Sequence, residues 1–219
     1  MWIEPIDIDE FLQAVAPALD ASSADELARR VGQRWTPQQV CGLLCHERPE
    51  VRKVACVVLG LVGAMAEARC LATALRDEDP KVNELAEQGM WSIFFRSGSD
   101  DATHHFKSGL AALERDDPRE AAIHFHGAHV ADPQFAEAYN QCAIAHYMLE
   151  EWDKSRRDCE RAIELAPIHF GALAGLGHCH AQLGCFGKAA EFYRRALTVN
   201  PRMEGIATVL QRLQEAMPT

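Results

Sequence analysis

Apolar side chains recur every three or four residues along most of this chain, as they do on one face of an α-helix. Residues 9–19, 51–63 and 204–217 show this spacing clearly, whereas the alternation of apolar and polar residues that is typical of a strand is scarce. Asp-Pro pairs at residues 79–80, 117–118 and 132–133 separate the periodic segments. The pattern predicts an all-α chain whose short helices pack as antiparallel hairpins.

The segments between residues 102 and 203 repeat with a fixed period. Pro133, Pro167 and Pro201 stand 34 residues apart, and each follows a segment with helical spacing. Aligned on these prolines, four more columns share a size or a chemical character: Gly109, Ala143 and Gly177; Ala121, Ser155 and Ala189; Phe125, Cys159 and Tyr193; Ala128, Ala162 and Ala196. Small residues let two helix backbones approach each other closely. The two columns that begin with Gly109 and Ala121 therefore predict where the helices of each hairpin cross.

This order of small, aromatic, alanine and proline positions over 34 residues resembles the tetratricopeptide repeat family. The resemblance implies an α-solenoid of stacked antiparallel helix hairpins. It covers repeats at about 102–135, 136–169 and 170–203, followed by a capping helix at about 204–217. The second repeat departs from the pattern, because Ser155 stands in place of an alanine and Cys159 in place of an aromatic residue. The capping helix presents one apolar face: Ile206, Val209, Leu210 and Leu213.

The first hundred residues repeat with a different period. A shift of 31 residues aligns three pairs: Pro49 with Pro80, Val51 with Val82, and Ala55 with Ala86. These segments resemble short HEAT repeats, although the second copy has Asn83 where the first has Arg52. The sequence therefore predicts a HEAT-like domain at residues 1–99 and a tetratricopeptide domain at residues 100–219.

Composition narrows the classes of function. The chain has 219 residues and a net charge of −10, without the basic stripe that contacts nucleic-acid phosphates. No apolar run reaches the roughly 18 residues that a membrane span needs, and the first ten residues lack the features of a secretory signal. Most of the eight cysteines lie within apolar helical patterns, which is typical of reduced core thiols. We expect a cytoplasmic protein that binds neither nucleic acid nor a membrane.

Candidate catalytic and metal-binding residues are few. Three groups of His and Cys lie close together in the sequence: Cys41, Cys45 and His46; His126 and His129; His178, Cys179 and His180. The first could meet a soft metal, and the second could bind zinc or sense pH, but the carboxylates that orient ligating imidazoles are not evident. The third lacks the orienting group that nucleophilic chemistry needs. We expect no catalytic residue, no metal site and no cofactor.

The resemblance implies a concave groove, lined by the first helix of each repeat, that holds segments of other proteins. The expected groove residues are mostly apolar or amide side chains: Phe106, Leu110, Leu113, Asn140, Gln141, Ile144, Tyr147, Met148, Ala174 and His178. One subset of the family holds acidic chaperone tails with a clamp of lysine, arginine and asparagine. The matching positions here lack that clamp: Phe106, Leu110, Gln141, Gly171 and Gly175. We expect the groove to bind an extended or helical peptide with apolar anchors.

These expectations favour a non-enzymatic adaptor or scaffold that binds a protein or peptide partner. Two alternatives stay open. The His46-Glu47 pair resembles one of those that HEAT-repeat iron hydroxylases carry, so the chain could be a metal-dependent hydroxylase or a HEAT-type lyase. It could also be a structural subunit whose groove is filled by a second copy, in which case the expected monomer would be a homodimer.

Overall fold

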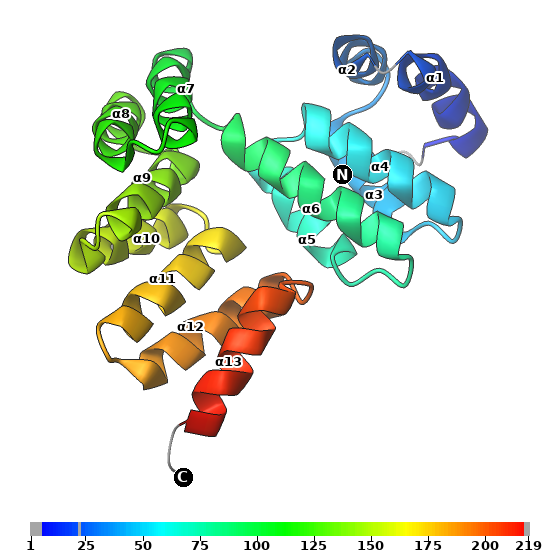
Figure 1. Ribbon diagram of the computed structural model, residues 1–219. Coiled ribbons are helices and arrows are strands. Elements are labelled where there is room, and N and C mark those ends of the chain that lie inside the picture. The colour runs from blue at the N-terminus through cyan, green and yellow to red at the C-terminus, as the bar shows by residue number, and fades with distance from the viewer. Residues whose placement is uncertain (1–5, 22, 217–219) are drawn as a thin grey trace. The chain divides into compact units, whose positions relative to one another are not determined.

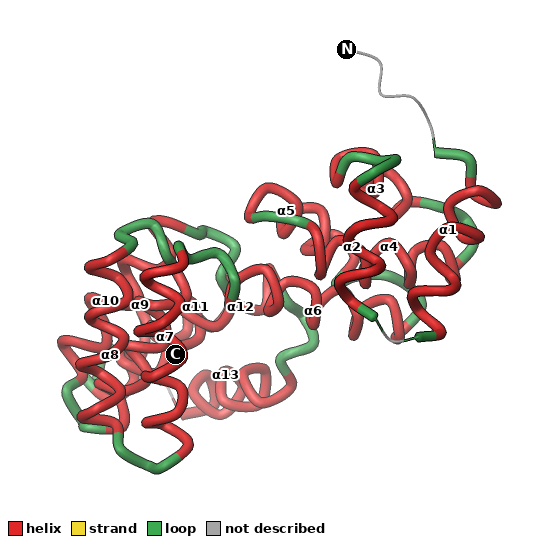
Figure 2. Tube along the Cα trace, turned by 90° about the horizontal axis from the view of Figure 1, so that it is seen from above, coloured by secondary structure: helices red, strands yellow, loops and turns green. Residues whose placement is uncertain are grey.

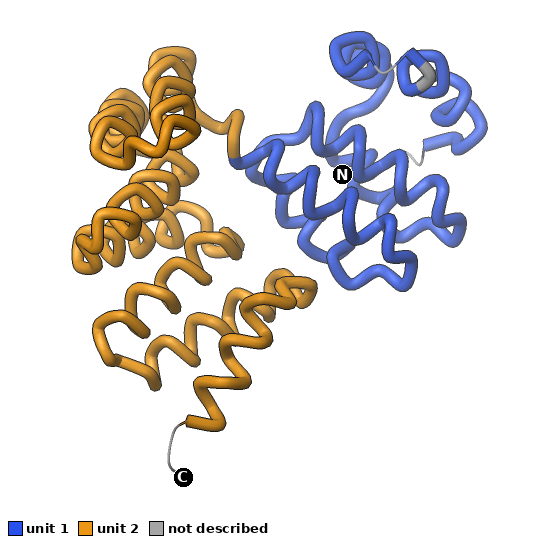
Figure 3. Tube along the Cα trace, viewed as in Figure 1, with its two compact units in different colours: residues 1–94 blue, residues 95–219 orange. Residues whose placement is uncertain are grey.

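The computed structural model describes residues 6–21 and 23–216. The expectations for the first five residues and for Met217 lie outside the described residues. Within them the chain forms helices joined by short turns and contains no strand (Figure 2), so the prediction of an all-α chain is confirmed. The chain divides into two compact units, residues 1–94 and 95–219 (Figure 3), where the sequence predicts a boundary after residue 99.

The described part of unit 1 consists of helices only (Figure 1). They are α1 (Ile8–Asp20), α2 (Ala24–Gly32), α3 (Pro37–Gly42), the 3-10 helix η1 (Leu43–Cys45), α4 (Pro49–Val62), α5 (Met65–Ala74) and α6 (Pro80–Phe95). The prolines of the 31-residue register begin α4 and α6, where a missing N–H costs no hydrogen bond. The aligned pairs Val51 with Val82 and Ala55 with Ala86 are all fully buried.

One polar pair fixes the turn that precedes α6. The Arg52 guanidinium donates to both carboxylate oxygens of Asp77, with N–O distances of 2.7 and 2.8 Å. At the matching position of α6, the Asn83 amide donates to the backbone carbonyls of Ala74 and Asp77 at 3.2 and 2.8 Å. Asn83, which departs from the HEAT-like pattern, therefore holds the same turn by side-chain hydrogen bonds to backbone carbonyl groups.

Unit 2 contains three successive hairpins and a final helix (Figure 1). The helices are α7 (Asp100–Glu114), α8 (Pro118–Ala131), α9 (Ala136–Met148), α10 (Trp152–Leu165), α11 (Phe170–Gln182), α12 (Phe186–Val199) and α13 (Glu204–Ala216). They pair as α7 with α8, α9 with α10 and α11 with α12, and α8 and α10 also contact the first helix of the following hairpin. The predicted solenoid of stacked hairpins is confirmed: Pro133 and Pro167 lie in the turns between hairpins, and Pro201 lies in the turn before α13.

The hairpins cross where the sequence places its small residues. A methyl group added to Gly109 would lie 2.6 Å from the ring of Phe125, and one added to Gly177 would overlap the ring of Tyr193. Both rings are buried, at 0% and 1% exposure. Glycine on the first helix thus makes room for an aromatic ring on the second.

The final helix packs on α12 through three of the four residues expected on its apolar face. Ile206 and Leu210 are buried, and Leu213 is partly buried against the same cluster as Tyr193. Val209, the fourth, is 37% exposed. Helix α13 therefore covers the last repeat along a narrower stripe than the sequence predicts.

None of the described helices is both long and apolar enough to span a lipid bilayer.

Candidate peptide-binding pocket

The groove residues expected on α7 lie in or against the core of the first hairpin. Phe106 is 2% exposed, and its ring centroid lies 5.6 Å from that of Phe125 and 4.8 Å from that of Phe135. Leu110 and Leu113 are partly buried and pack against the same cluster. The expectation that Phe106 lines an open groove is corrected, because Phe135, in the turn before α9, closes over its ring.

Two further expected groove residues are buried. Ala174 on α11 is 5% exposed and belongs to the core cluster around Tyr193. Gln141 is 8% exposed, and its Nε2 donates to Glu137 Oε1 at 2.7 Å. Both point into packing between helices, so neither offers a free surface to a ligand.

The other five expected residues gather around one pocket of about 130 Å³ between α9, α10 and α11. They are Asn140, Ile144, Tyr147, Met148 and His178. Ile144 and Met148 are 42% and 46% exposed, which is high for large apolar side chains in a folded chain. The sequence register therefore brings half of its predicted groove residues together.

Two more lining residues, Gly171 and Gly175, occupy positions that the sequence matches to the family clamp, whereas the sequence does not predict the other three: Ala143, Ser155 and Cys159. Cys159 occupies the column that holds Phe125 and Tyr193 in the neighbouring repeats, and a thiol fills much less space than a ring. Gly175 faces it without a side chain, since a methyl group there would lie 2.8 Å from the Cys159 sulfur. The pocket exists because the second repeat lacks its aromatic residue. The signal was present in the sequence as the departure at position 159.

The lining of the pocket is neutral. None of its described lining residues is a lysine or an arginine. Burial lowers the pKa of His178, whose Nδ1 is hydrogen-bonded to the Tyr193 hydroxyl at 2.9 Å, so this imidazole is uncharged at neutral pH. Burial also raises the pKa of Tyr193 to about 12.

Two of the polar groups near the pocket already have partners. The Asn140 amide nitrogen donates to Glu137 Oε1 at 3.2 Å, which leaves its carbonyl oxygen as an acceptor. The Tyr147 hydroxyl accepts a hydrogen bond from Gln182 Nε2 at 3.0 Å, while its ring meets the edge of Trp152 at 4.7 Å. The pocket therefore offers apolar surface with a few oriented polar atoms, as sites for small apolar groups do.

The structure does not assemble the His and Cys groups noted in the sequence into a nucleophilic site. The Cys179 thiol contacts Ser155 Oγ at 3.1 Å and is buried. Of its two neighbours in sequence, His178 bonds to Tyr193, and His180 stacks on Phe192 with a centroid distance of 5.4 Å. Neither imidazole is placed to take the proton of this thiol.

The possible metal ligands in unit 1 also stay apart. Among the described residues, one group of three His, Cys, Asp or Glu side chains could share an ion, and it does not include Cys41, Cys45 or His46. In unit 2, the other possible pair of metal ligands is His126 and His129. Their rings meet edge to face with a centroid distance of 4.7 Å, and His126 is exposed.

Family models for the tetratricopeptide repeat match residues 136–169 and 171–203. Among curated proteins, anaphase-promoting complex subunit 3 of Schizosaccharomyces pombe is 30% identical over 84 residues, 38% of this chain and 13% of that protein. The Hsp70-Hsp90 organizing protein of Triticum aestivum is 29% identical over 108 residues, 49% of this chain and 19% of that protein. The chain thus spans less than a fifth of either relative.

Solved structures show the same fold for the repeat region. The first tetratricopeptide domain of Spaghetti (RPAP3), bound to the HSP90 peptide SRMEEVD, has a TM-score of 0.53 and 21% identity, covering 54% of this chain and 94% of that one. The tetratricopeptide domain of Arabidopsis OM64 also has a TM-score of 0.53, with 20% identity over 54% of this chain and 98% of that one.

Proposed function

The chain carries tetratricopeptide repeats over residues 136–203, and on this premise we propose that it is an adaptor that binds a peptide segment of another protein. The pocket between α9, α10 and α11 carries the proposal. It would hold one apolar side chain of the partner, while the exposed Ile144 and Met148 beside it would cover the flanking residues. A leucine or aromatic anchor fits this lining, because transfer of apolar area from water stabilises the complex by about 25 cal/mol per Å².

The proposed ligand is not an acidic tail. Structural relatives include a domain bound to SRMEEVD, whose carboxylates need cationic partners to compensate for lost hydration. The lining residues of this pocket supply no lysine or arginine, and Gly171 and Gly175 occupy positions where the family clamp has charged side chains. Binding through apolar contact should also depend little on salt.

We propose a role in binding without catalysis, and a cytoplasmic location. Cys179, the possible nucleophile of the third repeat, is buried, and its thiol contacts Ser155 Oγ. All eight cysteines are free thiols, which suits a reducing compartment.

The test uses the tag-free chain and two kinds of fluorescent peptide. Peptides selected from a random display library on the immobilised chain should carry leucine or aromatic anchors, and the peptide SRMEEVD should bind at least ten times more weakly. Ile144→Asp should weaken the selected peptides by tenfold or more, because a carboxylate at the mouth of the pocket would lose hydration.

A matched control is available on α8. Ile123 is 72% exposed and does not line the pocket, so Ile123→Asp should leave peptide binding unchanged. Equal weakening by both variants, or tight binding of SRMEEVD, would contradict the proposal. Light scattering of the free chain tests the alternative that a second copy fills the pocket: a dimer that dissociates in Ile144→Asp but not in Ile123→Asp would favour self-association.

A further inference from the structure

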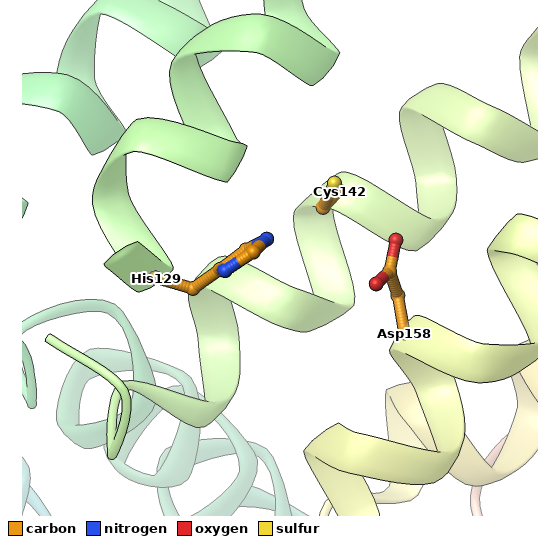
Figure 4. Close-up of side chains that lie close together, drawn as sticks. All are labelled: His129, Cys142 and Asp158. Atoms are coloured by element: carbon orange, nitrogen blue, oxygen red, sulfur yellow. The ribbon is translucent and has the colours of Figure 1, made fainter. Parts of the chain in front are cut away.

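Three side chains that are far apart in the sequence converge between the first and second hairpins of unit 2. His129 comes from the end of α8, Cys142 from α9 and Asp158 from α10, and Figure 4 shows them turned toward a common space. One ligand atom from each lies within 4.8 Å of the other two. We propose that this cluster binds a zinc ion.

The geometry is close to that of a zinc site. Tetrahedral zinc, with bonds of about 2.0 to 2.3 Å, places its ligand atoms about 3.3 to 3.8 Å apart. The cluster therefore has to contract by roughly 1 Å, which small side-chain rotations can supply. The His129 ring is already oriented, because it stacks on Tyr139 with a centroid distance of 4.3 Å and an interplanar angle of 13°.

His146 lies beside the cluster and is the proposed fourth ligand, although it is outside the group of three whose ligand atoms lie within 4.8 Å of one another. Its Nε2 lies 3.7 Å from Asp158 Oδ2, and its Nδ1 lies 2.6 Å from Glu151 Oε2. Donation of Nδ1–H to Glu151 leaves the lone pair of Nε2 directed at the Asp158 side of the cluster. A carboxylate that orients an imidazole in this way is the usual outer partner of a metal-bound histidine. Helical spacing in the sequence does not predict this pair, because Glu151 lies beyond the end of α9, in the turn before α10.

The donor set selects zinc over hard cations. One thiolate, two imidazoles and one carboxylate suit zinc or a similar transition metal, whereas magnesium and calcium prefer oxygen ligands. Burial raises the pKa of the Cys142 thiol, so at neutral pH binding must displace a proton from sulfur to the solvent as the Zn–S bond forms. With His146 drawn in as the fourth ligand, no coordination position would stay open, which is the arrangement of a structural ion.

Such an ion would join two repeats. His129 belongs to the first hairpin, whereas Cys142, His146 and Asp158 belong to the second. In a solenoid each repeat contacts only its neighbours, so the interface between adjacent hairpins sets how easily they separate. Zinc would therefore stabilise the interface between α8 and α9 against local opening.

The experiment uses the tag-free full chain, stripped with EDTA and titrated with zinc alone in competition with a chromophoric chelator. One ion per chain is expected. Cobalt should give a sulfur-to-metal charge-transfer band that disappears in Cys142→Ala. His129→Gln, Asp158→Asn and His146→Gln should each weaken zinc by roughly 100-fold or more, and Glu151→Gln by about 10- to 100-fold, as outer partners do.

His126→Gln is the control, since His126 is exposed on α8 and lies beside His129 without belonging to the cluster. It should bind zinc as the parent does. Cobalt binding by the parent without a charge-transfer band, or zinc affinity unchanged in Cys142→Ala, would overturn the proposal. So would equal loss in His126→Gln, which would place the ion on the surface of α8. Circular dichroism of each variant separates lost ligands from lost folding.

Discussion

Glu137 and His169 form a fully buried pair that joins α9 to the turn before α11. Both side chains are 0% exposed, and Glu137 Oε2 lies 2.6 Å from His169 Nε2. His169 Nδ1 accepts from the backbone N–H of Ala172, so Nε2 carries the proton that it donates to the carboxylate. Glu137 Oε1 accepts from Asn140 and Gln141. One carboxylate thus satisfies three donors and links the second repeat to the third.

Removal of this carboxylate should strongly destabilise unit 2. In Glu137→Ala the three donors stay buried without their acceptor, so we expect a loss of about 3–5 kcal/mol in the free energy of unfolding. Glu164→Ala is the control, because Glu164 is 64% exposed and its pair with Arg161 contributes less than about 1 kcal/mol. Urea unfolding monitored by circular dichroism measures both. A similar midpoint for the two variants would mean that water enters the site and replaces Glu137.

Two glycines in the third repeat should respond oppositely to alanine. Gly177→Ala forces a methyl group into the Tyr193 ring, and overpacking of this kind costs about 1–3 kcal/mol. Gly187, in the first turn of α12, is exposed and has no atom within 4 Å of an added methyl group. Gly187→Ala should therefore stabilise the helix by up to about 1 kcal/mol. Thermal melts that show both variants stabilised would disprove the close crossing at Gly177.

Stability should fall on mild acidification. Burial lowers the pKa of His178 below its ordinary value of 6.5, so the folded state holds this imidazole neutral while the unfolded state takes up a proton. The stability that depends on a neutral His178 is therefore fully present above about pH 6.5, and it is lost as the pH falls below that value. Urea midpoints between pH 7.5 and 5, with EDTA present, should decline less steeply in His178→Gln than in the parent. Parallel declines would assign the acid sensitivity to other groups.

The fold was predictable because its signals are local and repeated. Pro133, Pro167 and Pro201 end units of equal length, and Gly177 with Tyr193 shows how small and aromatic columns meet at a crossing. These features recur at one spacing, so a register is readable from one chain without knowledge of its neighbours in space.

The site was only partly predictable, because it depends on exceptions to the repeat. The repeat register assigns Phe106 to the groove, but the ring of Phe135, in the turn before α9, covers the Phe106 ring. Glu137 meets His169 across 32 positions in the sequence, a distance that no local spacing encodes. The proposed zinc ligands also come from separate helices, so only the stacking of hairpins brings them together.

An aromatic residue placed at position 159 should close the pocket of the second repeat. Phe125 and Tyr193 each face a glycine on the partner helix, whereas Cys159 belongs to a repeat with Ala143 at that position. The double variant Ala143→Gly with Cys159→Phe recreates the pairing of the neighbouring repeats, so the new ring should occupy the pocket without overpacking its hairpin. We expect the double variant to melt at or above the temperature of the parent, because buried ring area is gained.

Peptide binding by this double variant should be at least ten times weaker, since its anchor would meet the new ring. Cys159→Ser is the matched control: it changes the same residue but leaves the pocket open, so binding of the display-selected peptide should stay within about threefold of the parent, a difference of less than 1 kcal/mol. Fluorescence anisotropy measures both variants after circular dichroism has shown them folded. If the filled pocket still binds the peptide as the parent does, the partner docks elsewhere on the chain, and the adaptor role would have to rest on another surface.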